Sequence, residues 1–216
     1  MQNPAPCGVL CYSKAMTIAF IILLAILSVF AGLGASAIMA VLKFAPSVIR
    51  KISHLGAMAL IIVIAVLFGY KLFIVVGIVF AVLLLAIKFI HPPKALKNKE
   101  ARNSYGEIFF FVGVTLTALI ANSTSHFVIP IAILGLADTA AYIFGRSIKS
   151  PKLLFSKSLA GSLAFMIVAF LLLLIVTPWW VALIGGAVTA IAELVGLRGS
   201  DNVTIPVVAV LILSFV

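Results

Sequence analysis

Long apolar runs set the limits on what this chain can fold into. Eight mostly apolar stretches are separated by short polar pieces, and nearly all of them reach 18 residues or more. A run of that length with few charges is typical of a helix that spans a bilayer. The composition, 65% hydrophobic and 9% charged, excludes a water-soluble domain. The stretches are roughly 15–42, 46–70, 72–90, 104–121, 127–145, 157–177, 179–197 and 202–216.

The sequence therefore predicts an all-α, polytopic integral membrane protein with about eight transmembrane helices. Seven helices is the alternative, because the last stretch is short for a span and only Tyr70 and Lys71 separate the second from the third. We expect a short extracytoplasmic N-terminus at residues 1–14, followed by a single transmembrane domain at residues 15–216. The run after Lys14 is too long for a cleaved signal, which predicts a helix that stays.

The distribution of positive charge predicts the orientation. In a soluble protein a net charge of +10 would suggest a nucleic-acid partner, but here the basic residues lie in short loops, and we expect none. Of the 15 Lys and Arg residues, all except Lys14 and Lys71 fall in alternate loops. The positive-inside rule then places those loops in the cytoplasm and, with eight helices, both termini outside.

Acidic residues are scarce, with five in the chain, and Asp138 and Glu193 lie well inside apolar stretches. A carboxylate in a spanning helix is costly, by about 2.5–3.5 kcal/mol, so it indicates function. At 1.5 Å per residue, Asp138 lies about 10 Å and Glu193 about 7 Å from the cytoplasmic end of its helix. Asp201 opens the last helix on the same side. The structural alternatives are an N-cap for Asp201 and internal ion pairs for the other two.

A basic loop and a Ser/Gly-rich helix start lie on the same side as these acids. The loop carries Arg146, Lys149, Lys152 and Lys157. We expect the free N–H groups and the positive dipole end of the following helix to form an anion site. Ser158 would cap this helix and Gly161 would allow close backbone approach. Together these features predict a site for a metal-bound polyphosphate.

Magnesium suits such a site, because it binds oxygen ligands and usually takes one or two carboxylates plus phosphates. The candidate metal ligands are Asp138, Glu193 and Asp201. The chain contains neither a Walker A sequence nor G-x-G-x-x-G, which excludes the ordinary nucleotide-binding folds.

Two further patterns lie nearer the N-terminus. Arg50 and His54 are four residues apart and would share one helix face near the cytoplasmic end. Ser104 and Glu107 fit an S-x-x-E capping box ahead of an apolar run. Both patterns also have a structural explanation, a snorkelling arginine in the first case and a helix cap in the second.

Three stretches carry a family resemblance. They are L-A-D-T-A-A-Y-I-F-G-R at Leu136–Arg146, K-S-L-A-G-S at Lys157–Ser162, and E-L-V-G-L-R-G-S-D-N-V-T-I-P at Glu193–Pro206. They resemble the CTP-dependent lipid kinases, a group that includes phytol kinase, dolichol kinase and the CTP-dependent diacylglycerol kinase. R-K-I-S-H at Arg50–His54 and S-Y-G-E at Ser104–Glu107 look like further pieces of the pattern, so the resemblance covers most of the chain from Arg50 onward.

The resemblance implies that CTP, with Mg²⁺, donates its γ-phosphoryl group to the hydroxyl of a membrane lipid alcohol at the cytoplasmic face. The acceptor would be an isoprenoid alcohol of the polyprenol or phytol type, or diacylglycerol. The implied catalytic and metal-binding acids are Asp138, Glu193 and Asp201. The implied nucleotide-binding residues are Arg146, Lys149, Lys152, Lys157, Ser158, Gly161, Ser162, Asn202 and Thr204. Possible additional site residues are Arg50, His54, Tyr105 and Glu107.

Two rival functions remain open. Phosphatidate cytidylyltransferases belong to the same superfamily, and their A-D-T-G-A-Y stretch is close to Ala137–Tyr142. Those enzymes carry a longer C-terminal signature with K-D, H-G-G and D-R-x-D, whereas this chain has only Asp201 and Asn202, which favours the kinase.

The second rival is a cation-coupled transporter. It would place its acids near the middle of the bilayer beside broken helices, whereas here they cluster toward one face.

Overall fold

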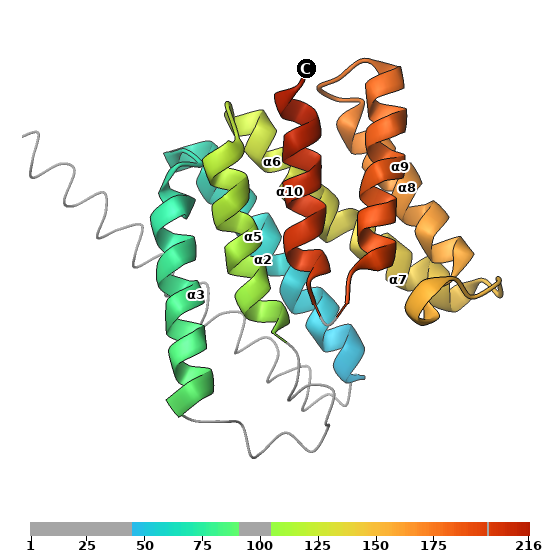
Figure 1. Cartoon of the computed structure of the whole chain (residues 1–216), viewed down its shortest axis with the longest axis horizontal. Coiled ribbons are helices and arrows are strands. Elements are labelled where there is room, and N and C mark those ends of the chain that lie inside the picture. Colours follow the sequence, from blue (N-terminus) through green and yellow to red (C-terminus); the bar gives the residue numbers. More distant parts are fainter. Residues whose placement is uncertain (1–44, 91–104, 198) are drawn as a thin grey trace, which may run out of the picture. The chain divides into compact units, whose positions relative to one another are not determined.

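The computed structural model describes residues 45–90, 105–197 and 199–216, and in these residues the chain is all-helical, as predicted, with no β-strand. The predicted helix at 15–42 and the polar stretch at 91–103 lie outside the described residues. Figure 1 shows the elements in order. They are α2 (Pro46–Phe68), α3 (Leu72–Ile90), α5 (Gly106–Ile120), α6 (Thr124–Ala132), the π-helical turn η1 (Ile133–Ala137), α7 (Asp138–Ser147), the 3₁₀ turn η2 (Leu154–Ser156), α8 (Leu159–Leu173), α9 (Trp179–Val195) and α10 (Asp201–Ser214).

Three helical stretches in the described part of the chain are long and apolar enough to cross a membrane, Ser47–Phe68, Leu72–Ile90 and Thr124–Ser147. The third combines α6, η1 and α7. The other four, α5, α8, α9 and α10, are apolar but shorter. A helix of 15 residues, such as α8, is about 22 Å long, less than the hydrocarbon core of about 30 Å. The structure therefore supports membrane helices, and the count of eight spans stays a prediction.

The chain divides into two compact units, Met1–Leu60 and Ile61–Val216, and α2 runs across the division. In the first unit the described part is the start of α2. This helix begins at Pro46, as predicted, because proline suits the first helical position. Arg50 is exposed and His54 is half-buried on this helix.

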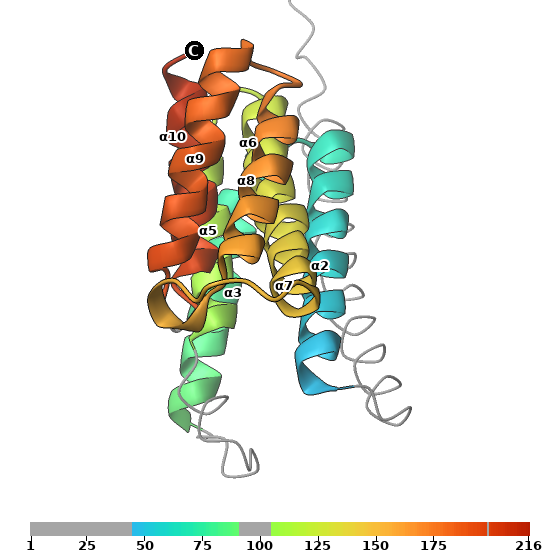
Figure 2. The same cartoon turned by 90° about the vertical axis from the view of Figure 1, so that its right-hand side faces the viewer.

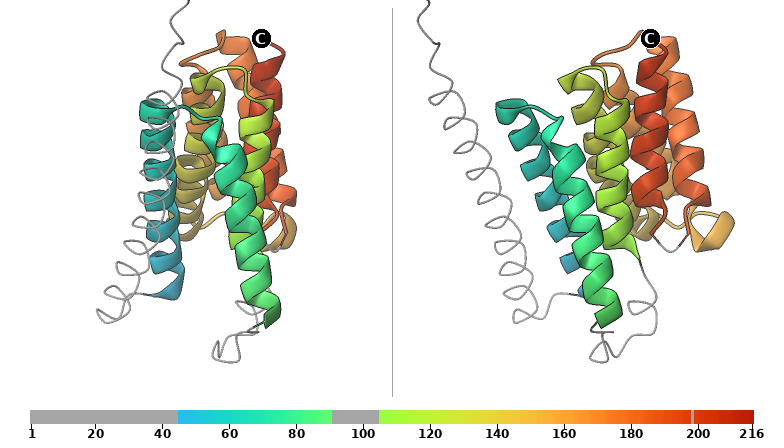
Figure 3. Two further views of the ribbon diagram at one scale, coloured as in Figure 1. Left: turned by 90° about the vertical axis from the view of Figure 1, so that its left-hand side faces the viewer. Right: turned by 60° about the vertical axis from the view of Figure 1, so that its left-hand side comes forward.

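The second unit has one apolar core, in which α10 packs against α5, α6 and α9 (Figure 1). Helix α8 lies between α7 and α9 (Figure 2), and α3 lies beside α5 (Figure 3). The π-helical turn η1 is at the centre of this core and touches α6, α7, α8 and α10. The largest fully buried side chains of this unit include Phe127, Ile131, Ile133, Leu134, Phe165, Leu173, Ile205 and Leu213.

The break between α2 and α3 falls where the sequence predicted it. Gly69 has φ +92°, a left-handed conformation that favours glycine, and it ends α2. The hydroxyl of Tyr70 donates a hydrogen bond of 3.0 Å to the Ala121 carbonyl oxygen. The rings of Tyr70 and Phe73 both stack on Phe127, with centroids 5.8 and 5.4 Å away. This turn therefore anchors α3 to the start of α6.

Three buried threonine hydroxyl groups in this unit donate to carbonyl groups four residues earlier in the chain. Thr117 donates to the Gly113 carbonyl at 2.7 Å, and Thr177 to the Leu173 carbonyl at 2.9 Å. Thr189 donates to the Gly185 carbonyl at 2.8 Å. This back-bonding to the preceding turn lets a hydroxyl lie in apolar surroundings without a second element.

Replacing Gly113 by alanine should destabilise the packing of α5 on α10. A Cβ at this position would overlap the Asn202 carbonyl oxygen and lie 3.1 Å from the Val203 Cα, and both are backbone atoms that cannot rotate away. We expect a loss of about 1–3 kcal/mol, the usual cost of overpacking a close contact. The measurement is the unfolding free energy in a denaturing-detergent titration.

Gly56→Ala is the matched control, because no described residue outside its own helical turn places an atom within 4 Å of a Cβ built there. Alanine is the better helix former in a helix interior, so this variant should be neutral or more stable by roughly 0.5–1 kcal/mol. Equal stability of the Gly113→Ala protein and the unsubstituted protein would contradict the close contact.

Candidate functional site

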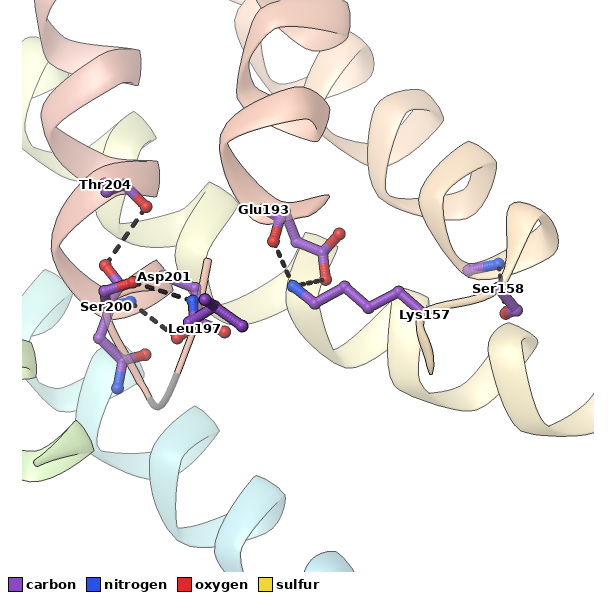
Figure 4. A network of polar contacts seen from close by, with 9 residues as sticks. Lys157, Ser158, Glu193, Leu197, Ser200, Asp201 and Thr204 are labelled. Atoms are coloured by element: carbon purple, nitrogen blue, oxygen red, sulfur yellow. Dashed lines mark hydrogen bonds and ion pairs between the residues drawn. The ribbon is translucent and has the colours of Figure 1, made fainter. Parts of the chain in front are cut away.

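A buried ion pair joins the start of α8 to the end of α9 (Figure 4). The Nζ atom of Lys157 lies 2.7 Å from Oε1 of Glu193, and the two side chains are 22% and 7% exposed. Nζ also donates to the backbone carbonyl oxygen of Glu193. Glu193 lies in the last turn of α9, where a cation complements the negative end of the helix dipole. One lysine thus compensates both a buried carboxylate and a helix C-terminus.

The second carboxylate oxygen of Glu193 is placed differently. Oε2 is buried and has no hydrogen-bond partner among the described residues. A buried acceptor of this kind is costly, and in native proteins it usually marks a place where a donor or a cation binds. Glu193 therefore has one oxygen neutralised by Lys157 and one that can still accept.

The three predicted acids do lie in one region. Asp138 is the first residue of α7 and Asp201 the first residue of α10, and both are close enough to Glu193 for their charges to act on it. The turn from α9 to α10 is tight, because a Cβ on Gly196 would lie 2.7 Å from the Cβ of Asp201. Within the described ranges, however, no three His, Cys, Asp or Glu side chains gather closely enough to hold a metal ion. The acids share an electrostatic field without forming a three-carboxylate ligand set.

A π-helical turn, which the sequence did not predict, precedes Asp138. η1 interrupts the helix from Thr124 to Ser147, and Pro130 lies inside the preceding α6. Such π segments occur frequently at functional sites, because they change the direction of the residues that follow. Ala137 is fully buried, whereas the next residue, Asp138, is partly exposed. The apolar letters of this turn, I-L-G-L-A, fit an ordinary helix equally well and gave no signal.

Helices α7 and α8 meet at two glycines. The Ser158 hydroxyl donates to the Gly145 carbonyl at 3.3 Å. A Cβ on Gly161 would lie 2.8 Å from the Ala141 carbonyl oxygen and 3.4 Å from the Gly145 Cα. The space beside Gly161 is therefore filled by α7, and this glycine serves helix packing rather than the predicted approach of a ligand.

The predicted anion site at the α8 N-terminus is wrong in its central feature, because the first N–H groups of this helix already have partners. The amide of Leu159 donates to the Pro151 carbonyl at 3.0 Å, and the amide of Ala160 to the Ser150 hydroxyl at 3.1 Å. The amide of Gly161 donates to the Ser158 hydroxyl at 3.2 Å, which confirms Ser158 as the predicted cap. The loop before α8 folds back on the helix end and takes up the donors that a phosphate would use.

Of the four predicted basic residues, only one pairs with an acid of the candidate site. Arg146 lies over the Tyr142 ring, 5.2 Å from its centroid, and donates to the Tyr142 hydroxyl. Lys149 and Lys152 are exposed on the loop between α7 and α8, so of the four predicted cations only Lys157 reaches Glu193.

Polar residues of the last motif have structural partners. The Asn202 amide donates to the Gly106 carbonyl at 2.8 Å, which ties α10 to α5. Thr204 donates to the Ser200 carbonyl at 3.2 Å. Ser162, by contrast, has a buried hydroxyl for which the described residues offer no partner.

Two predicted caps differ from the structure. Helix α5 begins at Gly106 with Tyr105 as its N-cap, so Glu107 is at the second helical position and not at the third, which a capping box requires. Ser104 lies outside the described residues. Tyr105 instead packs under Lys88, whose Nζ is 3.3 Å from the ring centroid. At α10 the N-cap is Ser200, which rules out that role for Asp201.

A comparison of the chain with family models, with curated proteins and with solved structures finds no match.

The Lys157–Glu193 pair should appear as an energetic coupling in a double-mutant cycle. Lys157→Met leaves a buried carboxylate without its cation. It should therefore destabilise the unsubstituted protein more than it destabilises a protein that already carries Glu193→Gln. We expect a coupling free energy of about 1–3 kcal/mol between the two sites, measured by denaturing-detergent titration of the four proteins. Lys152→Met, at an exposed lysine of the same loop, should stay within about 0.5 kcal/mol. Additive single effects would show that the pair does not form.

Proposed function

We propose that the chain is a CTP-dependent kinase that phosphorylates the hydroxyl of a membrane lipid alcohol at the cytoplasmic face of a multi-pass membrane domain. The acceptor class is an isoprenoid alcohol or diacylglycerol. One observation carries the proposal. The three stretches that resemble the CTP-dependent lipid kinases, 136–146, 157–162 and 193–206, come together in the fold. Lys157 pairs with Glu193, and Gly145 packs on Gly161.

The chemistry of phosphoryl transfer suits this arrangement. The reaction requires positioning and electrostatic stabilisation more than covalent participation of the protein. Lys157 is paired with Glu193, and Arg146 lies in the last turn of α7, the helix that begins at Asp138. An acid of the cluster, Asp138 in our proposal, would take the proton from the lipid hydroxyl as it attacks the γ-phosphorus.

Magnesium fits the oxygen chemistry of this region. Oε2 of Glu193 is a buried acceptor without a partner in the described chain, and Asp138 and Asp201 add negative charge beside it. Because Mg²⁺ usually takes only one or two carboxylates and completes its shell with phosphates and waters, a three-acid ligand set is not required. When bound, the ion would neutralise phosphate charge. Glu193 and Asp201 would hold it, and Asp138 would remain for the proton.

A cation-coupled transporter is the second candidate, and one specific observation favours it. The helix from Thr124 to Ser147 is broken by η1 directly before Asp138, and broken helices next to acids are typical of transporter sites. The kinase is favoured because the acid directly after the break acts on Glu193, and Glu193 is paired with Lys157, a cation that suits an anionic substrate. The cytidylyltransferase remains the rival within the same superfamily.

The position of the transferred label separates the two enzymes. Purified protein with CTP labelled at the γ-phosphate should transfer the label to a prenol or to diacylglycerol and release CDP. A cytidylyltransferase would attack the α-phosphorus with a lipid phosphate and release pyrophosphate. Pyrophosphate release that depends on phosphatidate, with no lipid labelled from the γ position, would replace the kinase by its rival. Sodium- or proton-driven uptake without any nucleotide turnover would favour the transporter.

Asp138→Asn should remove the activity while the protein inserts and purifies normally. The change deletes the proposed proton acceptor and a negative charge beside Glu193, so turnover should fall by about 10²- to 10⁴-fold. Loss of an acid from an apolar helix should not impair insertion. Glu100→Gln is the matched carboxylate-to-amide control and should keep the activity. Near-normal turnover of the Asp138→Asn protein would make this residue structural.

A further inference from the structure

The proposed phosphoryl transfer does not explain the composition of the loop between α7 and α8. Residues 148–155 read I-K-S-P-K-L-L-F, and they include two lysines and no acid. Both lysines are exposed. Four large apolar side chains beside them are also exposed, Ile148 at 49%, Leu153 at 38%, Leu154 at 52% and Phe155 at 56%. A loop facing only water would not be expected to gather so much apolar surface around its charges.

The backbone of this loop is held in a defined shape. Lys152 and Ser158 form an antiparallel bridge, and the amide of Leu153 donates to the Lys157 carbonyl at 2.6 Å. The amide of Lys157 donates in return to the Leu154 carbonyl at 3.1 Å. Phe155 has φ 52°, a left-handed conformation that is unfavourable for a bulky residue. The apolar tip Leu153–Phe155 is thus presented outward by a fixed turn.

A second set of exposed apolar residues lies on α8, the helix that follows the loop. Leu159, Leu163, Ile167 and Leu171 are exposed and follow each other at intervals of four residues, which places them along one helix face. In a helix that crosses a membrane, such a face meets the acyl chains. Helix α8 is about 22 Å long, shorter than the hydrocarbon core, so the loop at its end would be drawn to the depth of the headgroups.

We propose that residues 148–155 form an interfacial loop that binds anionic lipid headgroups. In this arrangement Leu153, Leu154 and Phe155 enter the boundary between headgroups and acyl chains, and Lys149 and Lys152 lie against lipid phosphates. A lipid surface is the occupant that matches both features, because long basic side chains and aromatic or aliphatic anchors are used together at membrane interfaces. The two lysines then give the loop a preference for negatively charged lipid, and Lys157 remains paired with Glu193.

A fluorescent label at the loop tip tests this placement without any measurement of catalysis. The full-length protein would carry Phe155→Cys in a background of Cys7→Ser and Cys11→Ser, with an environment-sensitive dye on the new cysteine. Nanodiscs would contain phosphatidylcholine alone or a mixture with phosphatidylglycerol. The readouts are emission wavelength, quenching by doxyl groups on the lipid chains and quenching by aqueous iodide.

We expect a blue-shifted label that doxyl lipids quench and iodide does not reach, with the strongest effect in the anionic discs. Lys149→Gln with Lys152→Gln should remove the dependence on anionic lipid, a change of roughly 30-fold in the equilibrium between the inserted and the water-exposed loop at about 1 kcal/mol per lysine. A label at Asn122→Cys, an exposed position in the turn between α5 and α6, is the control. Its signal should not respond to the two lysine changes.

Three outcomes would overturn the proposal. A label open to iodide in both lipid mixtures would show that the loop faces water. Shielding that ignores both the lipid charge and the lysine changes would remove the anionic headgroup from the interaction. If CTP and Mg²⁺ shield the label in neutral discs, and anionic lipid has no effect, Lys149 and Lys152 bind the nucleotide and not lipid headgroups. Because no turnover is measured, the result is independent of the proposed kinase activity.

Discussion

The buried carboxylate of Glu193 is the constraint that ties the start of α8 to the end of α9. A charge at this depth needs compensation, and Lys157 supplies it from a different helix. To do so, Lys157 must stand directly before α8, and its backbone is fixed there by the preceding loop. The same loop supplies partners for the first N–H groups of α8. One electrostatic requirement therefore determines the course of the loop, the start of α8 and its position against the end of α9.

The helices themselves could be predicted from the sequence, because apolar length and turn residues act locally. The boundaries at Pro46, at Tyr70–Lys71 and at Trp179 agree with the prediction to within a few residues. The membrane-span count could not be predicted equally well. Short apolar helices such as α8 and α10 give the same hydropathy signal as full spans, although they are shorter than the hydrocarbon core. The end of the fifth predicted segment was also placed closely, but the π turn within it was invisible, because apolar residues carry no information about helical register.

The candidate site was predictable in its residue types and only in part in its contacts. The scarcity of acids pointed to Asp138, Glu193 and Asp201, and they do lie in one region. The partner of Glu193 is 36 residues away in sequence, and such a pairing depends on how two helices pack. The same limit explains the error at the α8 N-terminus. From sequence alone, the first N–H groups of a helix are expected to be unsatisfied. Only the path of the loop in the folded chain shows that Pro151 and Ser150 accept hydrogen bonds from the first N–H groups of α8.

Saturation of the α8 N-terminus changes how an anionic substrate would be held. Backbone amides are already in use there, so in the proposed kinase side-chain cations would carry the binding of phosphate, and Lys157 is the one paired with Glu193. Yet Lys157 is also the counter-ion of Glu193, and one ammonium group cannot fully compensate a buried carboxylate and a polyphosphate together. In the proposed kinase a divalent cation bound to the nucleotide would resolve this conflict, because its positive charge would enter the site together with the phosphate charge. The ion pair would then hold the two helix ends in place until nucleotide and metal enter as one unit.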